Sequence, residues 1–312
     1  MKEKVICIVG PTGIGKTKLS IELAKYLKTE IINGDAIQIF KEGHILSAKP
    51  SLQEQEGIVH YLLDEKELDY RLDIASFKKE ASALITKINR QGMIPIVVGG
   101  SGLYLKALLY DYNLDQIQSK SQDIEIKYQN YSNEDLFDVL ANLDPQAAAI
   151  LHPNNRKRVL RGIDIALHNK MNKSEFIASQ KKEMMYDALV IGLNMDRESL
   201  YERINLRVDK MVENGLVEEV DDLIQRYNMF SEFQLFQAIG FKEFLPYYNL
   251  EIPLNLVFDN IKQNSRRYAK KQLTWLHNQM QVTWLEVDVD HFEDTIEQAK
   301  KLVGEHYGKN TV

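Results

Sequence analysis

The sequence is almost free of cysteine, because its 312 residues include only Cys7. A single thiol cannot form a disulfide within the chain, and it cannot supply a thiolate cluster for a metal. Stability must therefore come from a hydrophobic core, for which a chain of this length is sufficient. A reducing compartment is the natural setting for such a protein.

The sequence also lacks long hydrophobic runs. No apolar stretch approaches the roughly 18 residues of a membrane span. The run before the first glycine, residues 5–9, is too short for a signal peptide. Hydrophobic residues make up 44% and charged residues 27% of the chain, as in soluble globular proteins. We therefore expect a cytoplasmic protein with no membrane partner.

An excess of positive charge is absent as well, because the formal net charge is −6. A chain with this balance has no overall attraction for nucleic acid. Any contact with RNA or DNA therefore has to be made by a local basic patch.

What the sequence does contain is a phosphate-binding motif. Five apolar residues lead into G-x-x-x-x-G-K-T at residues 10–17. Gly10 and Gly15 allow the backbone to turn several N–H groups toward one anion. Lys16 adds a positive charge, and the Thr17 hydroxyl can bind Mg²⁺. The pattern predicts a strand, a phosphate loop and a helix, and it leaves open whether the ligand is a nucleotide or another diphosphate.

A second strand is predicted at residues 30–35, which places Asp35 at the carboxyl edge of a parallel sheet, where ligands bind. Three roles are open for Asp35: a catalytic base, the N-cap of a helix, or an outer ligand of Mg²⁺. The segments 36–40 and 46–50 are too polar and interrupted for a core, so we expect a loop at the site.

A third strand is predicted at residues 93–98, and Ser101 follows it after two glycines, at the same edge as Asp35. A serine in this place is also common as a turn residue or a helix cap. No carboxylate ends the strand, although a nucleotide hydrolase usually places its Mg²⁺-binding aspartate there. This difference argues against an ATPase. Residues 188–193 predict a fourth strand.

A helical insertion separates the third and fourth strands. Residues 113–186 contain helical patterns and no strand pattern. We therefore predict an α/β fold whose core is a parallel sheet of the phosphate-loop (P-loop NTPase-like) type, with an all-helical insertion domain. The core comprises residues 1–112 and 187–312, and the insertion domain comprises residues 113–186.

Three segments are rich in cations. The insertion has a cluster at residues 156–161, which by itself is most simply a solvated face. A helix after the fourth strand places Arg203, Arg207 and Lys210 on one face, where they can hold a diphosphate or pair with neighbouring acids. The last long helix mixes cations with aromatic and amide side chains, as single-stranded nucleic acid requires. This helix contains Arg266, Arg267, Tyr268, Lys270, Lys271, Gln272 and Trp275.

Together these motifs resemble those of the tRNA dimethylallyltransferases, the isopentenyl transferases that prenylate the adenosine just 3′ of the anticodon. The likeness covers nearly the whole chain. The family usually has serine, tyrosine and Asp-Ile-Gly-Thr where this chain has Ala36, Phe40 and residues 44–47, which changes the loop that meets RNA. The likeness rests on residues 10–17, Asp35 with Gln38, and the segments 47–50, 60–64, 98–104, 200–204, 207–209, 237–242 and 267–275.

The resemblance implies transfer of a dimethylallyl group from dimethylallyl diphosphate to N6 of that adenosine, in tRNAs that read codons beginning with U. It implies that Asp35 takes the N6 proton, that Ser101 makes a second polar contact, and that Thr17 holds Mg²⁺. The implied diphosphate-binding residues are Gly10, Thr12, Gly13, Gly15, Lys16, Thr17, Arg203 and Arg207. The implied contacts to the tRNA anticodon stem-loop are Asp35, Gln38, Ser101, Lys157, Arg158, Arg161, Gly240, Lys242, Arg267, Lys270, Lys271, Gln272 and Trp275. We expect a monomer.

Three other functions are open on the residues alone. A phosphate-loop nucleoside kinase also uses Mg²⁺ and an aspartate after the second strand, but it has no need of separate cationic and aromatic segments. A nucleotide-driven switch or helicase lacks its expected acid after the third strand. A non-catalytic RNA-binding protein is compatible with Ala36, Phe40 and Leu46 as signs of a decayed site.

Overall fold

The chain divides into two compact units in the computed structural model. The larger unit is formed by Met1–Leu109 and Met184–Val312, and the smaller unit by Tyr110–Glu183. No helix in the described part of the chain is both long enough and apolar enough to cross a membrane. The structure describes residues 2–110, 121–168, 175, 183–227 and 232–308.

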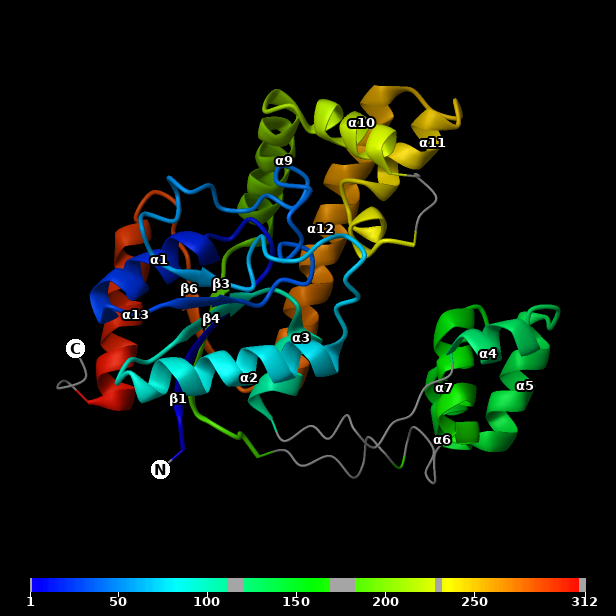
Figure 1. Cartoon of the computed structure of the whole chain (residues 1–312), viewed down its shortest axis with the longest axis horizontal. Coiled ribbons are helices and arrows are strands. Elements are labelled where there is room, and N and C mark those ends of the chain that lie inside the picture. The colour runs from blue at the N-terminus through cyan, green and yellow to red at the C-terminus, as the bar shows by residue number, and fades with distance from the viewer. Residues whose placement is uncertain (1, 111–120, 169–174, 176–182, 228–231, 309–312) are drawn as a thin grey trace. The chain divides into compact units, whose positions relative to one another are not determined.

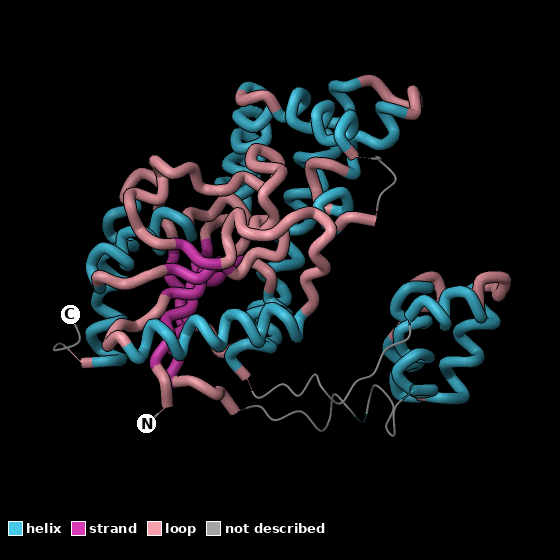
Figure 2. Tube along the Cα trace, in the orientation of Figure 1, coloured by secondary structure: helices cyan, strands magenta, loops and turns pink. Residues whose placement is uncertain are grey.

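The larger unit is built on a six-stranded parallel sheet with the order β3-β2-β4-β1-β5-β6 (Figures 1 and 2). Its strands are β1 (Lys4–Val9), β2 (Ile31–Asn33), β3 (His60–Tyr61), β4 (Ile96–Gly99), β5 (Asp187–Asn194) and β6 (Thr283–Glu286). Because β1 pairs with β4 on one side and β5 on the other, the segment after β1 emerges near the middle of the carboxyl edge. The predicted α/β fold with a parallel sheet is confirmed.

The strand β1 is apolar because both of its faces are covered. Ile6 and Ile8 lie in one core cluster with buried residues of α1 and α13. Val5, Cys7 and Val9 alternate with them, so they point to the opposite face, and they too are fully buried. The helices of this unit are α1 (Lys16–Leu27), α2 (Ile74–Arg90), α3 (Gly102–Leu109), α9 (Arg197–Glu213), α10 (Leu216–Arg226), α11 (Leu245–Tyr248), α12 (Leu254–Gln279) and α13 (Phe292–Tyr307), with 3₁₀ turns η1 (Gln234–Gln237) and η2 (Lys242–Phe244).

The segment after β2 differs in part from the prediction. It is irregular, as expected, but Ile39, Phe40 and Leu46 are at most 4% exposed, so the expectation that this segment lies outside the core is wrong for these side chains. The reason is a covering segment that is distant in sequence. A Cβ added to Gly43 would lie 2.9 Å from the Leu235 side chain, which shows how closely the two segments pack.

Where the structure describes it, the smaller unit contains α4 (Ser121–Lys127), α5 (Asn133–Leu143), α6 (Pro145–Ile150) and α7 (Arg156–His168). Its own core includes Leu136, Leu140, Val159 and Ile163, which lie on the facing sides of α5 and α7. A capping box begins α5, and the buried Asp144 caps α6 ahead of a proline. The unit therefore has the local signals and the apolar contacts of an independent helical bundle.

Two glycines provide opposite tests of this packing. A Cβ on Gly99 would lie 2.5 Å from the Gly34 carbonyl oxygen, whereas a Cβ on Gly304, within α13, would meet no atom within 4 Å. Gly99→Ala should therefore destabilise the protein by about 1–3 kcal/mol through overpacking. Gly304→Ala should stabilise it by roughly 0.5–1 kcal/mol through helix propensity. Urea unfolding measures both changes, and a Gly99→Ala variant as stable as the wild type would contradict the close approach of β4 to the end of β2.

Candidate active site

The phosphate loop has the backbone that the motif predicted. Gly10, Gly13 and Gly15 have φ angles of +152°, +80° and +106°, which residues other than glycine rarely adopt. Gly15 is the N-cap of α1 and provides no side-chain cap, so the first N–H groups of α1 are free of a capping side chain. A helix start of this kind attracts an anion through its N–H groups and its dipole.

Lys16 lies inside this loop rather than in bulk water. Its Nζ donates a hydrogen bond of 2.7 Å to the Pro11 carbonyl oxygen. Burial, together with repulsion from the Arg207 guanidinium, lowers the pKa of Lys16 to about 8, although the Asp35 carboxylate acts in the opposite direction. The loop thus holds a lysine whose charge a bound anion would stabilise. Thr17, the next residue, is exposed.

Two arginines of α9 contact the phosphate loop. Arg203 Nε donates to the Gly13 carbonyl oxygen at 2.9 Å, and Arg207 Nη1 donates to Thr12 Oγ1 at 2.8 Å. Burial lowers the pKa of Arg207, while the charge of Asp35 acts against that change. Two of the three cations that share one helical face in the sequence therefore lie beside the phosphate loop, and their contact with a diphosphate stays a prediction.

Asp35 follows β2 at the carboxyl edge of the sheet, and its charge favours the protonated forms of both Lys16 and Arg207. Its Oδ1 also accepts the Ile37 N–H at 2.9 Å and the Gln38 N–H at 3.4 Å. The side chain therefore caps the turn after β2. No helix begins at this described turn, so the cap differs from the helix N-cap that was one of the roles left open. A catalytic role would use the same carboxylate, and it stays a prediction.

Ser101 follows β4 and begins α3, because its carbonyl oxygen accepts the N–H groups of Tyr104 and Leu105. Its side chain interacts with the hydroxyl of Tyr268 from α12 and lowers the pKa of that phenol. Tyr268 is 41% exposed as a whole residue, but desolvation of its hydroxyl, followed by the charge of Asp35, is the larger effect and raises its pKa to about 12, so this hydroxyl is protonated at neutral pH. From the sequence, Tyr268 was an aromatic side chain among cations, and nothing there indicated its place beside Ser101 and Asp35.

Gln272 has a role that differs from the expected RNA contact. Its side chain is buried, its Oε1 accepts the Thr12 N–H at 3.1 Å, and its Nε2 donates to the Gly100 carbonyl oxygen at 3.0 Å. One amide thus joins the phosphate loop to the turn after β4. Trp275 also packs within the protein: its indole ring lies so close to Gly102 that a Cβ added there would be 2.2 Å away.

Gly240 and Gln38 likewise hold protein segments together. Gly240 is buried with a φ of +105°, and its N–H donates to the Glu243 carboxylate at 2.8 Å. The Gln38 amide donates to the carbonyl oxygens of Ser47 and Ala48, at 3.1 Å each. Gln38, Gly240 and Gln272, three of the residues that the resemblance placed at the RNA, therefore make contacts within the protein around the site.

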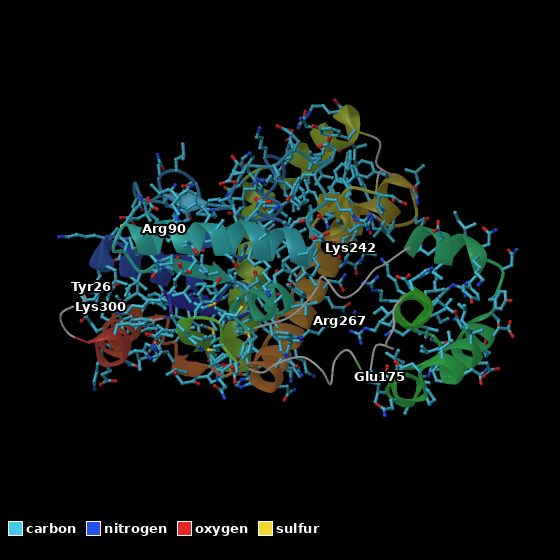
Figure 3. All side chains as sticks on the ribbon, turned by 60° about the horizontal axis from the view of Figure 1, so that its bottom comes forward. Tyr26, Arg90, Glu175, Lys242, Arg267 and Lys300 are labelled. Atoms are coloured by element: carbon cyan, nitrogen blue, oxygen red, sulfur yellow. The ribbon has the colours of Figure 1, made fainter. Side chains whose placement is uncertain are left out.

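The exposed cations are in the places where an anionic partner can reach them. Lys242 and Arg267, labelled in Figure 3, are exposed, as are Lys270 and Lys271 on α12. Within the described ranges, no ion pair involves any of these four. In the smaller unit, Lys157 and Arg158 are exposed, whereas Arg161 forms a 2.9 Å ion pair with the buried Asp164. Arg156 is used internally, since its guanidinium donates to the carbonyl oxygens of Tyr128 and Tyr131.

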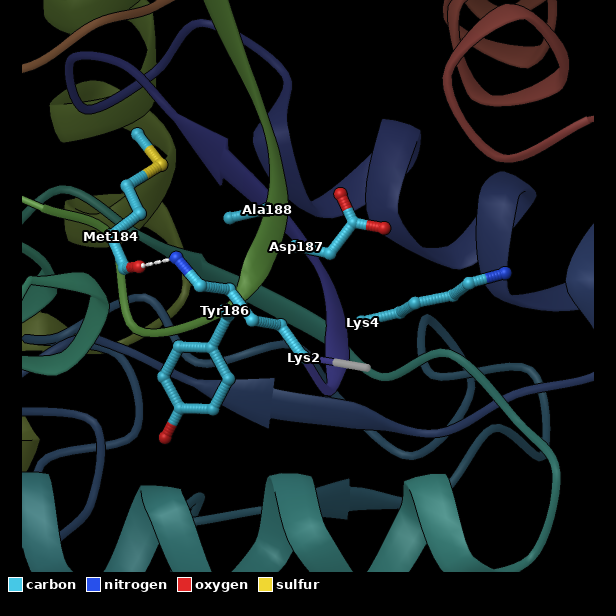
Figure 4. A pocket seen from close by; sticks show the side chains of 6 residues that line it. All are labelled: Lys2, Lys4, Met184, Tyr186, Asp187 and Ala188. Atoms are coloured by element: carbon cyan, nitrogen blue, oxygen red, sulfur yellow. Dashed lines mark hydrogen bonds between the residues drawn. The ribbon is translucent and has the colours of Figure 1, made fainter.

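The hollows on the described surface of the larger unit include two with different neighbours. One, of about 280 Å³, is lined in part by the two residues that follow Asp35 in the chain. Its lining is Ala36, Ile37, Glu232, Gln234, Gln237 and Ala238. The other, of about 480 Å³, lies where β1 and β5 begin, at the edge opposite the phosphate loop (Figure 4). Its lining is Lys2, Lys4, Met184, Tyr186, Asp187 and Ala188. Only the first hollow is next to the candidate catalytic residue.

The low pKa of Lys16 predicts how diphosphate binding depends on pH. In the free protein, Lys16 loses its proton as the pH rises through about 8. A bound diphosphate favours the charged form and raises this pKa, so the affinity should fall as the pH is raised from 7 to 9, and binding at pH 8 should take up as much as about half a proton. Calorimetric titration in buffers of different ionisation enthalpy measures both. Lys16→Met is the control for titration of the ligand itself, and equal proton uptake in both proteins would contradict the assignment.

Comparisons with known proteins agree on one family. The family model described as IPP transferase matches residues 38–279. The tRNA dimethylallyltransferase of Staphylococcus carnosus is 44% identical over 295 residues, covering 91% of this chain and 92% of that protein. The Bacillus subtilis tRNA dimethylallyltransferase is 42% identical over 289 residues, covering 92% and 91%.

Solved structures show the same relationship. A tRNA isopentenylpyrophosphate transferase from Staphylococcus epidermidis matches with a TM-score of 0.72 and 40% identity, over 97% of this chain and 99% of the other. A eukaryotic dimethylallyltransferase acting on tRNA matches with a TM-score of 0.85 and 31% identity, over 99% of this chain and 80% of the other. The resemblance inferred from the motifs is confirmed, and the chain belongs to the IPP transferase family.

Proposed function

We propose that this protein transfers a dimethylallyl group from dimethylallyl diphosphate to N6 of the adenosine just 3′ of the anticodon in tRNA. The observation that carries the proposal is that Lys16, Arg203 and Arg207 meet at one loop. The charge of Asp35 favours the protonated forms of Lys16 and Arg207. Cations gathered at an anion-binding loop can stabilise the negative charge of the leaving diphosphate. A carboxylate at the same edge of the sheet can accept the proton of the nucleophile.

The leaving-group side of the reaction is served by the phosphate loop. The bond between the allylic carbon and the diphosphate oxygen breaks, and diphosphate departs with the electron pair. The N–H groups at the start of α1, Lys16 and the two α9 arginines stabilise the negative charge that grows on that oxygen. Thr17, the residue after Lys16, is exposed, and its hydroxyl would hold Mg²⁺. When bound, the ion adds positive charge to the leaving group.

The acceptor side is served by Asp35 and Ser101. The exocyclic N6 of adenine attacks the allylic carbon, and its proton passes to the Asp35 carboxylate as the new N–C bond forms. Ser101 provides a second polar contact to the amine, and its neighbour Tyr268 is a neutral hydroxyl that can hydrogen-bond without taking the proton. The target base has to leave its stack to reach these groups.

The exposed cations bind the RNA. Arg267, Lys270 and Lys271 of α12, with Lys242, contact the phosphates of the anticodon stem-loop in this proposal. Lys157, Arg158 and Arg161 of the smaller unit add contacts to the same stem-loop. Cations on two units of one chain are well suited to hold a folded RNA while its base is withdrawn.

The alternatives gain less support. The names of the relatives favour prenyl transfer to tRNA over a nucleoside kinase. The idea of a decayed, non-catalytic site rested partly on Phe40, but this side chain is fully buried, so its missing hydroxyl does not remove a group from the site surface. Leu46 is buried as well and fills space next to Gly240.

The experiment that tests the proposal is transfer from labelled dimethylallyl diphosphate to unmodified tRNA with Mg²⁺ and without ATP. The proposal expects label on N6 of the adenosine 3′ of the anticodon. Phosphorylation of a nucleoside by ATP in the absence of such label would support the kinase instead, and RNA binding with no chemistry would support a decayed site.

Asp35→Asn should lower kcat by roughly 10²- to 10⁴-fold, the usual contribution of a positioned general base. Asparagine keeps an Oδ1 acceptor for the Ile37 N–H, so the turn should be kept, and any change in binding constants that follows from the lost charge near Lys16 and Arg207 should be much smaller than the change in kcat. Single-turnover transfer and equilibrium binding measure these quantities. Asp69→Asn, at an exposed position outside the site, is the matched control. A kcat equal to that of the control would leave Asp35 only its capping role.

Replacing Arg267, Lys270 and Lys271 together by alanine should weaken tRNA binding and reduce the slope of log K against log salt concentration by about 2, since each lost phosphate contact removes about 0.7. The affinity for dimethylallyl diphosphate should not change. A triple alanine variant of Lys79, Arg90 and Lys301, exposed cations on α2 and α13, controls for net charge. Equal slopes in the triple variant and the wild type would show that the α12 cations form only a solvated face.

A further inference from the structure

The segment 36–50, here called the acceptor loop, leads away from Asp35 without regular secondary structure except isolated turns. Its first turn is fixed by Asp35, and its two halves are joined by the Gln38 amide, which donates to the Ser47 and Ala48 carbonyl oxygens. A displacement of the second half of the loop is therefore passed to the turn that carries Asp35.

The second half of the acceptor loop is held by one carboxylate from another element. Glu219, on α10, accepts the Ile45 N–H with Oε1 at 3.0 Å and the Leu46 N–H with Oε2 at 2.8 Å. Both oxygens of a half-buried carboxylate are thus engaged with adjacent backbone donors. Charge-assisted bonds of this kind are stronger and more directional than those between neutral groups.

Other contacts between α10 and the acceptor loop are weaker. Arg226 makes a two-pronged ion pair with Glu42, at 2.7 and 2.9 Å, but both side chains are partly open to water. Exposed ion pairs contribute little to the position of a backbone segment. The two bonds to Glu219 are therefore the main polar link on this side of the loop.

The helix that carries Glu219 is tied to the phosphate loop. Only Asn214 and Gly215 separate α9 from α10, and Gly215 has a φ of +96°, which makes the sharp turn between them. At the other side of this helix pair, Arg203 and Arg207 contact the phosphate loop. The α9–α10 pair thus touches the diphosphate side of the site with its arginines and the acceptor side with Glu219.

We propose that Glu219 is a positioning residue, which holds the acceptor loop so that Asp35 and the base it serves stand in line with the diphosphate at the α9 arginines. The inference rests on the proposed function. Reactions between two bound groups are sensitive to such alignment, and a misplacement of about 1 Å can cost roughly 10²-fold in rate. Loss of the Glu219 bonds should therefore slow transfer without weakening diphosphate binding.

The test compares Glu219→Gln with Glu218→Gln, the same change at the neighbouring exposed position of α10. A glutamine at position 219 keeps one acceptor and turns an NH₂ group toward the other backbone N–H. We expect kcat for transfer to tRNA to fall roughly 10- to 100-fold, while the KM and the calorimetric Kd for dimethylallyl diphosphate stay within about twofold of wild type. The Glu218→Gln control should match the wild type.

A double-mutant cycle with Gln38→Ala tests whether Glu219 acts on Asp35 through the acceptor loop. If Glu219 acts through the acceptor loop, the double variant should lose less than the product of the two single losses. Glu219→Asp, which keeps the charge but shortens the reach, should show a smaller loss of kcat in the same direction, and it decides the question if Glu219→Gln does not fold.

Three results would overturn the inference: a kcat for Glu219→Gln equal to that of Glu218→Gln, a parallel loss of diphosphate affinity that marks a general structural defect, or full multiplicativity with Gln38→Ala. Failure of the proposed function is distinct, because the wild type itself would then transfer no label to tRNA.

Discussion

The site depends on one buried amide. Gln272 joins the phosphate loop to the turn after β4 by accepting the Thr12 N–H and donating to the Gly100 carbonyl oxygen. The arrangement requires Gly100 to be glycine, because a Cβ there would lie 2.2 Å from the amide nitrogen. Buried amides are costly unless both of their ends are paired, so this contact also fixes the depth at which α12 lies against the sheet edge.

The helix α12, which carries Gln272, both packs against the site and presents exposed cations to solvent. Tyr268, Gln272 and Trp275 are spaced by four and three positions, so they share a face. They meet Ser101, Gly100 and the start of α3 respectively. The exposed cations Arg267 and Lys270 lie off that face, and the exposed Lys271 lies at its border. One helix therefore completes the catalytic edge and presents positive charge to a partner, which a chain with a net charge of −6 has to concentrate locally.

The sequence predicted the parts of the fold whose cause is local. Long apolar strands such as β1 and β5 and the glycine pattern of the phosphate loop were predicted, and the structure contains them. The strands β3 and β6 were missed because neither contains an apolar run: β3 has only two residues, and β6 has only Trp284 and Leu285 between polar neighbours. The roles of Gln38, Gly240 and Gln272 could not be predicted, because an amide or a glycine looks the same in a sequence whether it meets RNA or a backbone distant in the chain. Ile39, Phe40 and Leu46 were misjudged for the same reason, since the segment that covers their loop lies about two hundred positions further on.

The central claim is that the cations around the phosphate loop form a site for an allylic diphosphate. The most direct measurement is calorimetric titration of the wild-type protein with dimethylallyl diphosphate and, separately, with ATP, each in the presence of Mg²⁺. The account predicts that dimethylallyl diphosphate binds at least about tenfold more tightly, equivalent to roughly 1.4 kcal/mol, and that Arg207→Ala removes most of that difference. Tighter binding of ATP, with no effect of the arginine, would contradict it.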